Sequence, residues 1–285
     1  MALFENMEKL SFIGPGVMAE AIARNLVQAD LITAEQVIMS GPNETRLADL
    51  DARYEFSTIS DNRKAVQQAA IVVLSVKPQS LSLVLDELAG KIAPGSLVIS
   101  IVAGAKLDSI SDRLRHPAVV RCMPNTPAQI GEGITVWMPT ASVSTEHLEL
   151  SRKILQSLGD EILVNDEDYL DMATALSGTG PAYTFLFMEA MVDAGVHLGF
   201  PRRIAEQLVI RTVKGSVAYY DHTPRHLARL RNQVTSPGGT SAEALYYLEK
   251  AGFRTALSRA IWAAYERSVQ LGKGKKRGAM DDSQG

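Results

Sequence analysis

The sequence is poor in features that mark several classes of protein. Cys122 is the only cysteine among 285 residues, so the chain cannot form an intrachain disulfide, which fits a reducing compartment. The formal net charge at pH 7 is only -3, so no overall positive field recruits nucleic acid. The short basic run at residues 272–278 is interpreted as a solvated, flexible end rather than a nucleic-acid patch.

Targeting and membrane signals are also missing. Residues 1–10 (MALFENMEKL) include acidic side chains and lack a basic start followed by an apolar run, so we expect no signal peptide. The apolar runs, such as residues 69–76, are far too short to cross a bilayer. We therefore expect a cytoplasmic protein with neither a membrane nor a nucleic acid as partner.

Metal-binding and nucleophilic motifs are absent from the sequence. His222 and His226 are four residues apart, but Pro224 interrupts a regular turn between them, and there is no H-E-x-x-H motif or Cys/His cluster. Cys122 lies in an apolar segment without a histidine nearby in sequence, which indicates a buried structural thiol. No G-x-S-x-G or Walker lysine motif occurs. The sequence therefore predicts no metal site.

The first part of the chain alternates short apolar segments with helical patterns. Continuous apolar runs are typical of strands that helices cover on both faces. The predicted strands are residues 9–13, 36–40, 71–76, 97–102, 119–123 and 133–138, and the predicted helices include residues 17–29 and 80–92. The alternation predicts an α/β fold with a parallel, doubly wound sheet of Rossmann type.

The pattern changes after residues 160–168, beyond which we predict no further strand. Three segments have helical spacing and apolar residues on more than one face, namely residues 181–199, 202–220 and 254–271. Helices of this kind are buried in a core or in a subunit interface, so we predict an oligomer. The predicted regions are a nucleotide-binding domain at residues 1–164, an all-helical domain at residues 165–272 and a flexible tail at residues 273–285.

A glycine-rich turn follows the first predicted strand and opens the first predicted helix. Its sequence fits the G-x-G-x-x-A form of the dinucleotide-binding fingerprint. Gly14 permits the tight turn, Gly16 lets the backbone approach a pyrophosphate, and Ala19 allows close packing of helix on strand. Free N–H groups at the helix N-terminus suit the phosphates. The predicted cofactor-binding residues here are Gly14, Gly16, Val17, Met18 and Ala19.

The end of the second predicted strand bears on the choice between NAD and NADP. NAD enzymes usually place Asp or Glu there for the ribose 2′-hydroxyl, whereas this chain has Ser40 and Asn43, with Arg46 a few residues on. These hydroxyl, amide and guanidinium groups suit a 2′-phosphate, so NADPH is the predicted cofactor and NADH the alternative. In a purely structural interpretation, Asn43 lies near a helix cap. Lys77, after another strand, either faces phosphate or ribose or is a solvated loop lysine.

Several motifs together resemble one family. They are GPGVMAEAI (14–22), VKP (76–78), SIVAG (100–104), RCMPNTPAQIGEG (121–133), SGTGPAY (177–183) and LRNQVTSPGGTSAEAL (230–245). Their order and spacing resemble those of the pyrroline-5-carboxylate reductases, over roughly residues 8–272. The first two motifs are shared with other dehydrogenases, including relatives of 6-phosphogluconate dehydrogenase. The MPNTP and SPGGT motifs are much more specific.

The resemblance implies a fold and a reaction. The fold is an N-terminal Rossmann domain followed by an all-helical dimerisation domain, with each active site shared between subunits of a dimer or of a decamer built as a ring of dimers. The reaction is the last step of proline biosynthesis, in which NADPH transfers a hydride to the imine carbon of 1-pyrroline-5-carboxylate and L-proline is formed.

The resemblance also implies roles for single residues. It adds Asn62, Val76, Lys77, Pro78, Ala103, Gly104 and Asn125 to the cofactor site. It places Ser236, Gly239, Thr240 and Ser241 in the substrate loop. The family usually has threonine at Ser241, so the hydroxyl is kept and a methyl group is lost. Thr179 likewise stands where serine is common.

The residues of the substrate loop suit the chemistry of an imine acid. Glycine N–H groups at a helix N-terminus form a ready carboxylate site. Thr240 and Glu243 fit a capping box, which predicts Thr240 at the N-cap and Ser241 at the first helical position. Ser241 is the predicted catalytic residue, hydrogen-bonding the ring nitrogen directly or through water. The plainer alternative is that Ser241 faces water or is itself the cap.

Two other functions are weighed against the reductase. One is a β-hydroxyacid dehydrogenase relative that reduces a carbonyl, against which the SPGGT motif argues. The other is a dinucleotide-binding regulatory protein that has lost catalysis, against which the intact substrate loop argues.

Overall fold

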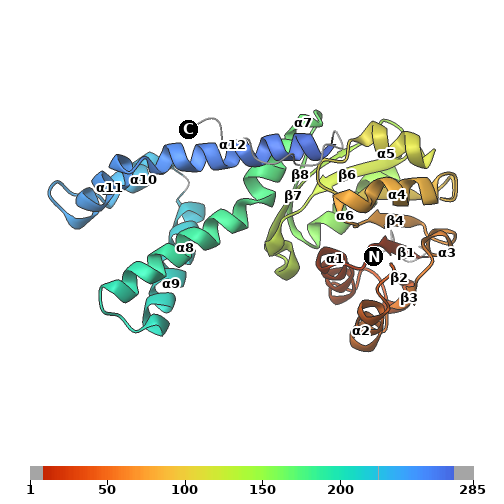
Figure 1. Ribbon diagram of the computed structural model, residues 1–285, viewed down its shortest axis with the longest axis horizontal. Helices are drawn as coiled ribbons and strands as arrows, with labels where there is room; N and C mark the ends of the chain where they lie inside the picture. Colours follow the sequence, from red (N-terminus) through yellow and green to blue (C-terminus); the bar gives the residue numbers. More distant parts are fainter. Residues whose placement is uncertain (1–8, 224, 273–285) are drawn as a thin grey trace. The chain divides into compact units, whose positions relative to one another are not determined.

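The computed structural model describes residues 9–223 and 225–272 (Figure 1). The predicted flexible tail lies outside the described residues, as do Pro224 and most of the segment assessed for a signal peptide. Compact packing divides the chain into two units, one of Met1–Thr179 with Ala264–Gly285 and the other of Gly180–Ala263. Each unit is described by itself.

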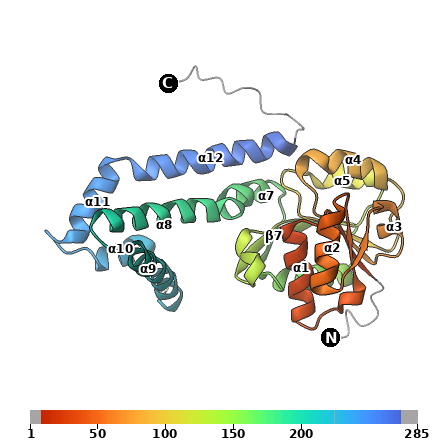
Figure 2. The same ribbon diagram turned by 60° about the horizontal axis from the view of Figure 1, so that its bottom comes forward.

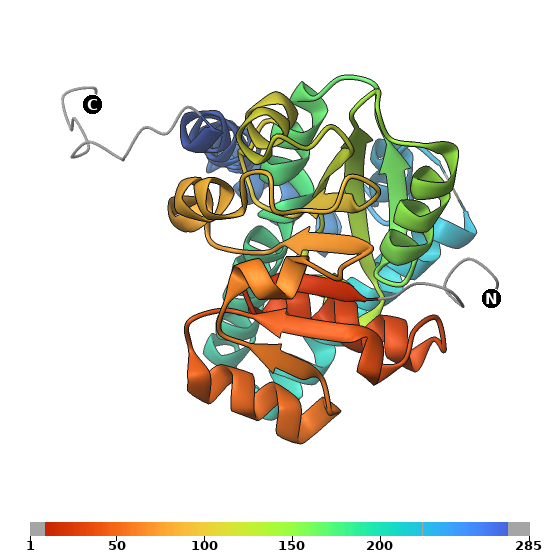
Figure 3. The same ribbon diagram turned by 90° about the vertical axis from the view of Figure 1, so that its right-hand side faces the viewer.

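The first unit is an eight-stranded sheet with helices on both faces (Figure 3). Its strands are β1 (Leu10–Ile13), β2 (Val37–Ser40), β3 (Ser57–Ile59), β4 (Ile71–Leu74), β5 (Leu97–Ser100), β6 (Val119–Met123), β7 (Gly133–Pro139) and β8 (Gly159–Leu163). Its α-helices are α1 (Val17–Gln28), α2 (Glu44–Tyr54), α3 (Asn62–Val66), α4 (Pro78–Leu88), α5 (Leu107–Leu114), α6 (Thr145–Gln156) and α7 (Asp168–Ala173). Short 3₁₀ turns at Ala34–Gln36 and Thr126–Ile130 and a π-helical turn at Thr174–Gly178 complete it.

The strand order is β3-β2-β1-β4-β5-β6-β7-β8. The chain moves outward from β1 to β3 and then returns to place β4 on the other side of β1. The order therefore reverses at the β1–β4 pair, and open α/β sheets bind ligands beyond the carboxyl ends of the strands at such a point. The predicted fold class is confirmed.

Three details differ from the sequence-based prediction. β7 pairs antiparallel with β6, whereas a wholly parallel sheet was expected. Residues 124–132 between them hold only a 3₁₀ turn and are too short for a parallel crossover, which needs about a dozen residues or more. The prediction also missed β3, which has only three residues, and β8, whose acidic Asp160 and Glu161 break its apolar run.

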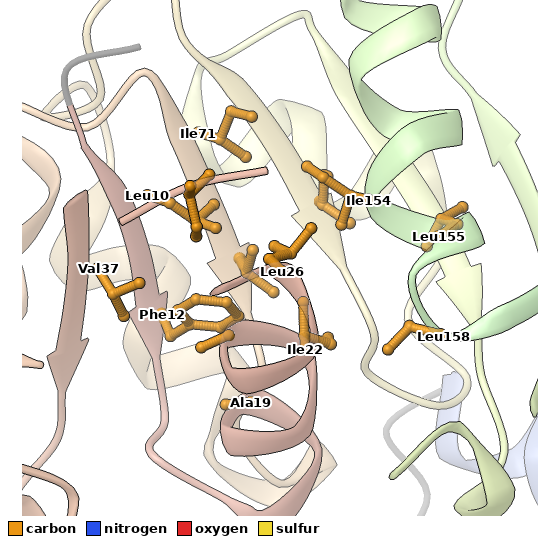
Figure 4. Packing of buried hydrophobic residues seen from close by; sticks show 14 of the residues in the cluster. Leu10, Phe12, Ala19, Ile22, Leu26, Val37, Ile71, Ile154, Leu155 and Leu158 are labelled. Carbon is orange, nitrogen blue, oxygen red and sulfur yellow. The ribbon is translucent and has the colours of Figure 1, made fainter. Parts of the chain in front are cut away.

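Successive residues of each central strand pack alternately into two hydrophobic cores, which lie on opposite faces of the sheet. Ile71 packs in the cluster that contains Phe12 and Ile22 of α1 (Figure 4), while its neighbour Val72 packs in the cluster that contains Leu85 of α4. This follows from the two-residue period of a strand. Because both faces are covered, β1, β2, β4 and β5 are buried along their whole length, as their continuous apolar sequences predict.

The second unit is all-helical. It consists of α8 (Gly180–His197), α9 (Arg202–His222), α10 (Leu227–Gln233), α11 (Thr240–Lys250) and the first part of α12 (Phe253–Gly272), whose last residues belong to the first unit. α8 and α9 lie side by side, with a small buried cluster of Val192, Ala205 and Val209 between them (Figure 2). The predicted helices at residues 181–199, 202–220 and 254–271 are confirmed.

Large apolar side chains of the helical unit are exposed in the single chain. Phe185, Leu186 and Trp262 are each 60–66% exposed. Exposed apolar surface on this scale marks an interaction surface in a folded protein. Among the described residues, no helix is both long enough and apolar enough to cross a membrane.

Candidate active site

The turn between β1 and α1 has the geometry that a dinucleotide-binding turn requires. Gly14 has φ +103°, a conformation that favours glycine, and a Cβ atom there would lie 2.8 Å from the backbone of Ser75. Gly16 is the N-cap of α1, so the first N–H groups of the helix have no intrahelical acceptor. Ala19 is fully buried against the sheet, and Val17 is 60% exposed at the start of the helix. The turn is therefore fitted to hold a pyrophosphate.

Neighbouring strand ends hold this turn in place. The Gly14 N–H donates to the Ser40 carbonyl at the end of β2, at 2.8 Å. The Ser75 hydroxyl, just after β4, donates to the Gly14 carbonyl at 2.8 Å. The fingerprint turn is thus bound to the strand on each side of β1, which orders it before any ligand arrives.

The polar residues after β2 are engaged with protein groups. The buried Ser40 hydroxyl donates to Asn62 Oδ1 at 2.8 Å, and Asn62 Nδ2 donates to Glu87 at 2.9 Å. Asn43 is the N-cap of α2, because its side chain accepts from the Arg46 N–H at 3.0 Å. Asn43 therefore caps α2, and its side-chain oxygen already has a donor.

Arg46 lies beside the fingerprint turn. Its Nε donates to the Pro15 carbonyl at 3.0 Å, and its two terminal nitrogens pair with Asp49 and Glu20. The side chain is 25% exposed, so part of the guanidinium remains open to solvent. Arg46 is thus placed at the rim of the turn, although the sequence did not reveal its two acidic partners.

The loops after β4 and β6 reach the same sheet edge. Lys77 is exposed and is the N-cap residue of α4, with Pro78 at the first helical position. After β6, Asn125 Oδ1 accepts from the Ile134 N–H at 3.0 Å, which ties the MPNTP loop to β7. The buried Asn25 of α1 donates to the Ala128 carbonyl of the same loop at 2.9 Å. These residues position the loop beside the fingerprint helix.

The loop after β5 packs against the end of α12. Gly104 has φ +75°, and a Cβ atom there would lie 2.8 Å from the Gly272 nitrogen and the Ser268 carbonyl oxygen. Ala103 beside it is half-buried. The backbone approach explains why glycine is needed at residue 104, a reason that the local sequence does not show.

A buried ionic network lies below this loop, and the sequence reasoning missed it. Asp171 of α7 is 1% exposed and accepts from Arg121 Nη2 of β6 at 2.9 Å and from Ser268 Oγ of α12 at 2.8 Å. Lys106, two residues beyond Gly104, has its Nζ 3.3 Å from Asp171 Oδ2. The network therefore links β6, α7, α12 and the loop after β5.

Asp171 and Lys106 each stabilise the charged form of the other. Burial opposes ionisation of Asp171, but Arg121, Ser268 and Lys106 outweigh it and hold the pKa of the carboxyl below its usual value. The pKa of Lys106 is raised, because its acidic partners outweigh the desolvation of its ammonium group. Both groups are therefore charged at neutral pH.

The substrate loop differs from the prediction in its helix register. Gly239, with extended backbone, is the N-cap of α11, and Thr240 is the first helical residue, so Thr240 does not cap the helix and the predicted capping box is wrong. The Glu243 N–H donates to the Gly239 carbonyl at 3.2 Å. Ser241 consequently lies at the second helical position, where it is half-buried. A Cβ atom at Gly239 would lie 2.8 Å from Ser236 Oγ, so the turn is tightly closed.

The histidines and the cysteine have structural surroundings. His222 Nδ1 lies 2.9 Å from the Ala218 carbonyl, and His226 accepts from the Ala228 N–H as the N-cap of α10. Within residues 9–223 and 225–272 no group of three or more His, Cys, Asp or Glu side chains is arranged to hold a metal ion. Cys122 is fully buried, and burial raises the pKa of its thiol to about 12.

Sequence comparison decides the family. Residues 167–271 match the family model of pyrroline-5-carboxylate reductase dimerisation. The pyrroline-5-carboxylate reductase of Synechocystis sp. is 40% identical over 265 residues, which cover 93% of this chain and 98% of the relative. The chain belongs to the pyrroline-5-carboxylate reductase family. The reductase of Pseudomonas aeruginosa is 37% identical over 92% of this chain and 96% of the relative.

Structural comparison supports the same assignment to the pyrroline-5-carboxylate reductases. The crystal structure of the Plasmodium falciparum pyrroline carboxylate reductase with NADP bound has a TM-score of 0.87 and 32% identity, and the match covers 94% of this chain and 99% of that one. Residues 9–104, which include the fingerprint turn, match the model described as NADP oxidoreductase coenzyme F420-dependent. The chain is thus an oxidoreductase that uses NAD(P)H and forms homo-oligomers through a dimerisation domain.

Proposed function

We propose that this protein reduces 1-pyrroline-5-carboxylate to L-proline with a hydride from NADPH, the last step of proline biosynthesis. The single observation that carries the proposal is the whole-length match to pyrroline-5-carboxylate reductases, at 40% identity over 93% of the chain for one of them. Two helix starts support the proposal: α1, whose N-cap is Gly16, would bind the cofactor, and α11, whose N-cap is Gly239, would bind the substrate.

The nucleotide would be held along the carboxyl edge of the sheet. The turn and the first N–H groups of α1 suit its pyrophosphate, and Arg46 at the rim suits a 2′-phosphate. The other residues proposed to contact it are Gly14, Gly16, Val17, Met18, Ala19, Ser40, Asn43, Asn62, Val76, Lys77, Pro78, Ala103, Gly104 and Asn125. When bound, the reduced nicotinamide supplies the hydride.

The substrate would be held by the entrance of α11. The N–H groups of Thr240 and Ser241 begin a helix whose N-cap is Gly239, and such an end binds a carboxylate. Ser236 closes the turn beneath Gly239. The Ser241 hydroxyl is proposed to hydrogen-bond the ring nitrogen, directly or through water, and so to assist the protonation that completes the reduction.

The proposed domain organisation has residues 1–164 as the NADP-binding domain and residues 165–272 as the helical dimerisation and substrate domain. The compact units divide the chain differently, since residues 165–179 and 264–272 pack with the sheet in the first unit. Each active site would be shared between the subunits of a dimer, and dimers would assemble into a ring-shaped decamer. The exposed apolar side chains of α8 and α12 support the burial of these helices against another subunit. A cytoplasmic location stays a prediction from the sequence.

An assay of the purified full chain tests the proposal. Oxidation of NADPH should depend on added 1-pyrroline-5-carboxylate, and L-proline should appear in equal amount. The variant Ser241→Ala is the matched control, because it removes only the hydroxyl from the proposed site and should lower kcat/KM for the imine. A carbonyl substrate preferred over the imine, or no oxidation with either, would contradict the proposed reaction.

A further inference from the structure

Arg46 is the cation that the proposed 2′-phosphate site depends on, yet acidic side chains surround it. Its Nη1 donates to Asp49 Oδ2 at 2.8 Å, and its Nη2 pairs with Glu20 Oε2. Only its Nε is directed to the fingerprint turn, where it donates to the Pro15 carbonyl at 3.0 Å. Arg46 therefore differs from the unopposed cation that would bind a phosphate most strongly.

Glu20, Arg46, Asp49 and Arg53 form a charged cluster, and Glu20 lies at its centre. It lies in the first turn of α1, its side chain is 13% exposed, and its Oε1 accepts from Arg53 Nη2 and from the Tyr54 hydroxyl, each at 2.7 Å. Burial opposes its ionisation, but the Tyr54 hydrogen bond and the two arginines outweigh burial and lower the pKa of the carboxyl. Glu20 is therefore a carboxylate at neutral pH.

The cluster is electrically balanced. Arg46 and Arg53 contribute two positive charges, and Glu20 and Asp49 contribute two negative charges. A 2′-phosphate would meet a neutral group of side chains in which one anion is already partly buried. Because charges interact more strongly when solvent is excluded, the buried Glu20 opposes an incoming phosphate more than the half-exposed Asp49 does.

We propose that Glu20 is a positioning residue that determines cofactor specificity: it aims Arg46 at the fingerprint turn while offsetting its charge, so that the enzyme discriminates only weakly between NADPH and NADH. This inference rests on the proposed cofactor site. The absence of an acidic residue after β2 predicted a preference for NADPH. Glu20 of α1 supplies an acidic side chain near that position and so weakens the expected preference. The charge that limits binding of the 2′-phosphate lies 26 residues before the arginine in sequence.

Binding of two nucleotide fragments tests the role of Glu20 without turnover. The probes are 2′,5′-ADP, which carries the 2′-phosphate, and 5′-AMP, which lacks it, titrated calorimetrically into the full chain. Glu20→Gln keeps the shape and one acceptor oxygen but leaves the cluster with one excess positive charge. It should tighten 2′,5′-ADP binding about tenfold and change 5′-AMP binding less than about twofold.

Two variants provide matched controls. Asp49→Asn makes the same change of charge at a side chain that is 45% exposed, so it should tighten 2′,5′-ADP binding by less than about threefold. Arg53→Gln makes the opposite change and should weaken 2′,5′-ADP binding by about threefold. The ratio of kcat/KM for NADPH to that for NADH should move in the same order.

The proposal is overturned if Glu20→Gln weakens the binding of both 2′,5′-ADP and 5′-AMP by the same factor, which would show a structural role only. It is also overturned if Glu20→Gln leaves 2′,5′-ADP binding unchanged. If Glu20→Gln does not fold, Arg53→Gln still decides, because an unchanged or tighter 2′,5′-ADP affinity in that variant contradicts the charge balance. Failure of wild type to bind either fragment would refute the cofactor site together with this proposal. Normal fragment binding without imine reduction would refute the proposed reaction alone.

Discussion

Replacing Asp171 with asparagine tests the buried network under the loop after β5. The carboxylate is 1% exposed and contacts Arg121, Ser268 and Lys106 at 2.9, 2.8 and 3.3 Å respectively. Asp171→Asn keeps the shape and one acceptor oxygen but removes the negative charge. It leaves the Arg121 guanidinium, which is 2% exposed, with Glu167 as its remaining acidic partner at 2.8 Å.

The expected loss of stability is large. Breaking a buried ion pair from one side costs about 3–5 kcal/mol, because the remaining charge is left buried without its partner. Glu167 and the retained amide oxygen compensate in part, so we expect a value near the lower end, about 3 kcal/mol. Asp168→Asn is the matched control, since Asp168 also pairs with Lys106, at 3.1 Å, but is 64% exposed. It should cost less than about 1 kcal/mol.

Urea unfolding at one fixed protein concentration measures both variants, because oligomer stability depends on concentration. The pKa of Asp171 is lowered in the folded protein, so the contribution of its carboxylate is complete above the unfolded pKa of about 4 and is lost as the pH falls through the folded value. Asp171→Asn should therefore destabilise the protein at pH 7 and lose part of the wild-type acid sensitivity below about pH 4.

Equal stability of the two variants at pH 7 would refute this reasoning. It would mean that the buried carboxylate contributes no more than an exposed one, and that Arg121 finds compensation elsewhere. An acid transition of Asp171→Asn identical to that of wild type would refute the link between the lowered pKa and stability.

Four further outcomes follow from the structure. Gly14→Ala places a Cβ atom 2.8 Å from the Ser75 backbone at φ +103°, so we expect a strain of about 1–3 kcal/mol and weaker NADPH binding, measured by nucleotide fluorescence; wild-type affinity would contradict the tight turn. Thr240→Ala should lower the free energy of unfolding by less than the roughly 0.5–2 kcal/mol typical of a lost N-cap, because Thr240 is not the cap. Ser241→Ala should leave the melting temperature unchanged but lower kcat/KM for the imine about 10²–10⁴-fold if the hydroxyl assists proton transfer. Cys122, whose pKa is raised to about 12 by burial, should react with a thiol reagent only after denaturation, and rapid labelling of the native protein would contradict its burial.

Much of the fold could be predicted because it depends on local patterns in the chain. The apolar runs of β1, β4 and β5 predict strands covered on both faces, and the structure buries them completely. The turn at Gly14 could be recognised from its position between strand and helix, since its backbone conformation is a local property. The motifs that carry the family resemblance are likewise contiguous.

The direction of β7 and the helix register of α11 were not predicted correctly. β7 runs antiparallel because the segment before it is too short for a crossover, a property of loop length rather than of strand composition. The register of α11 was misjudged by one residue, because the sequence TSAE fits a capping box while the extended backbone of Gly239 supplies the N-cap instead.

The ionic networks could not be predicted, because they depend on tertiary contacts between residues far apart in sequence. Arg121 and Asp171 are 50 residues apart, and Ser268 lies a further 97 residues beyond Asp171, yet the three side chains share one buried network. Arg46 pairs with Glu20 across two helices. Such contacts leave no periodicity in a single sequence, because the partners are brought together only when the sheet and its helices pack. The sequence alone thus locates a nucleotide turn, while folding decides which charges surround it.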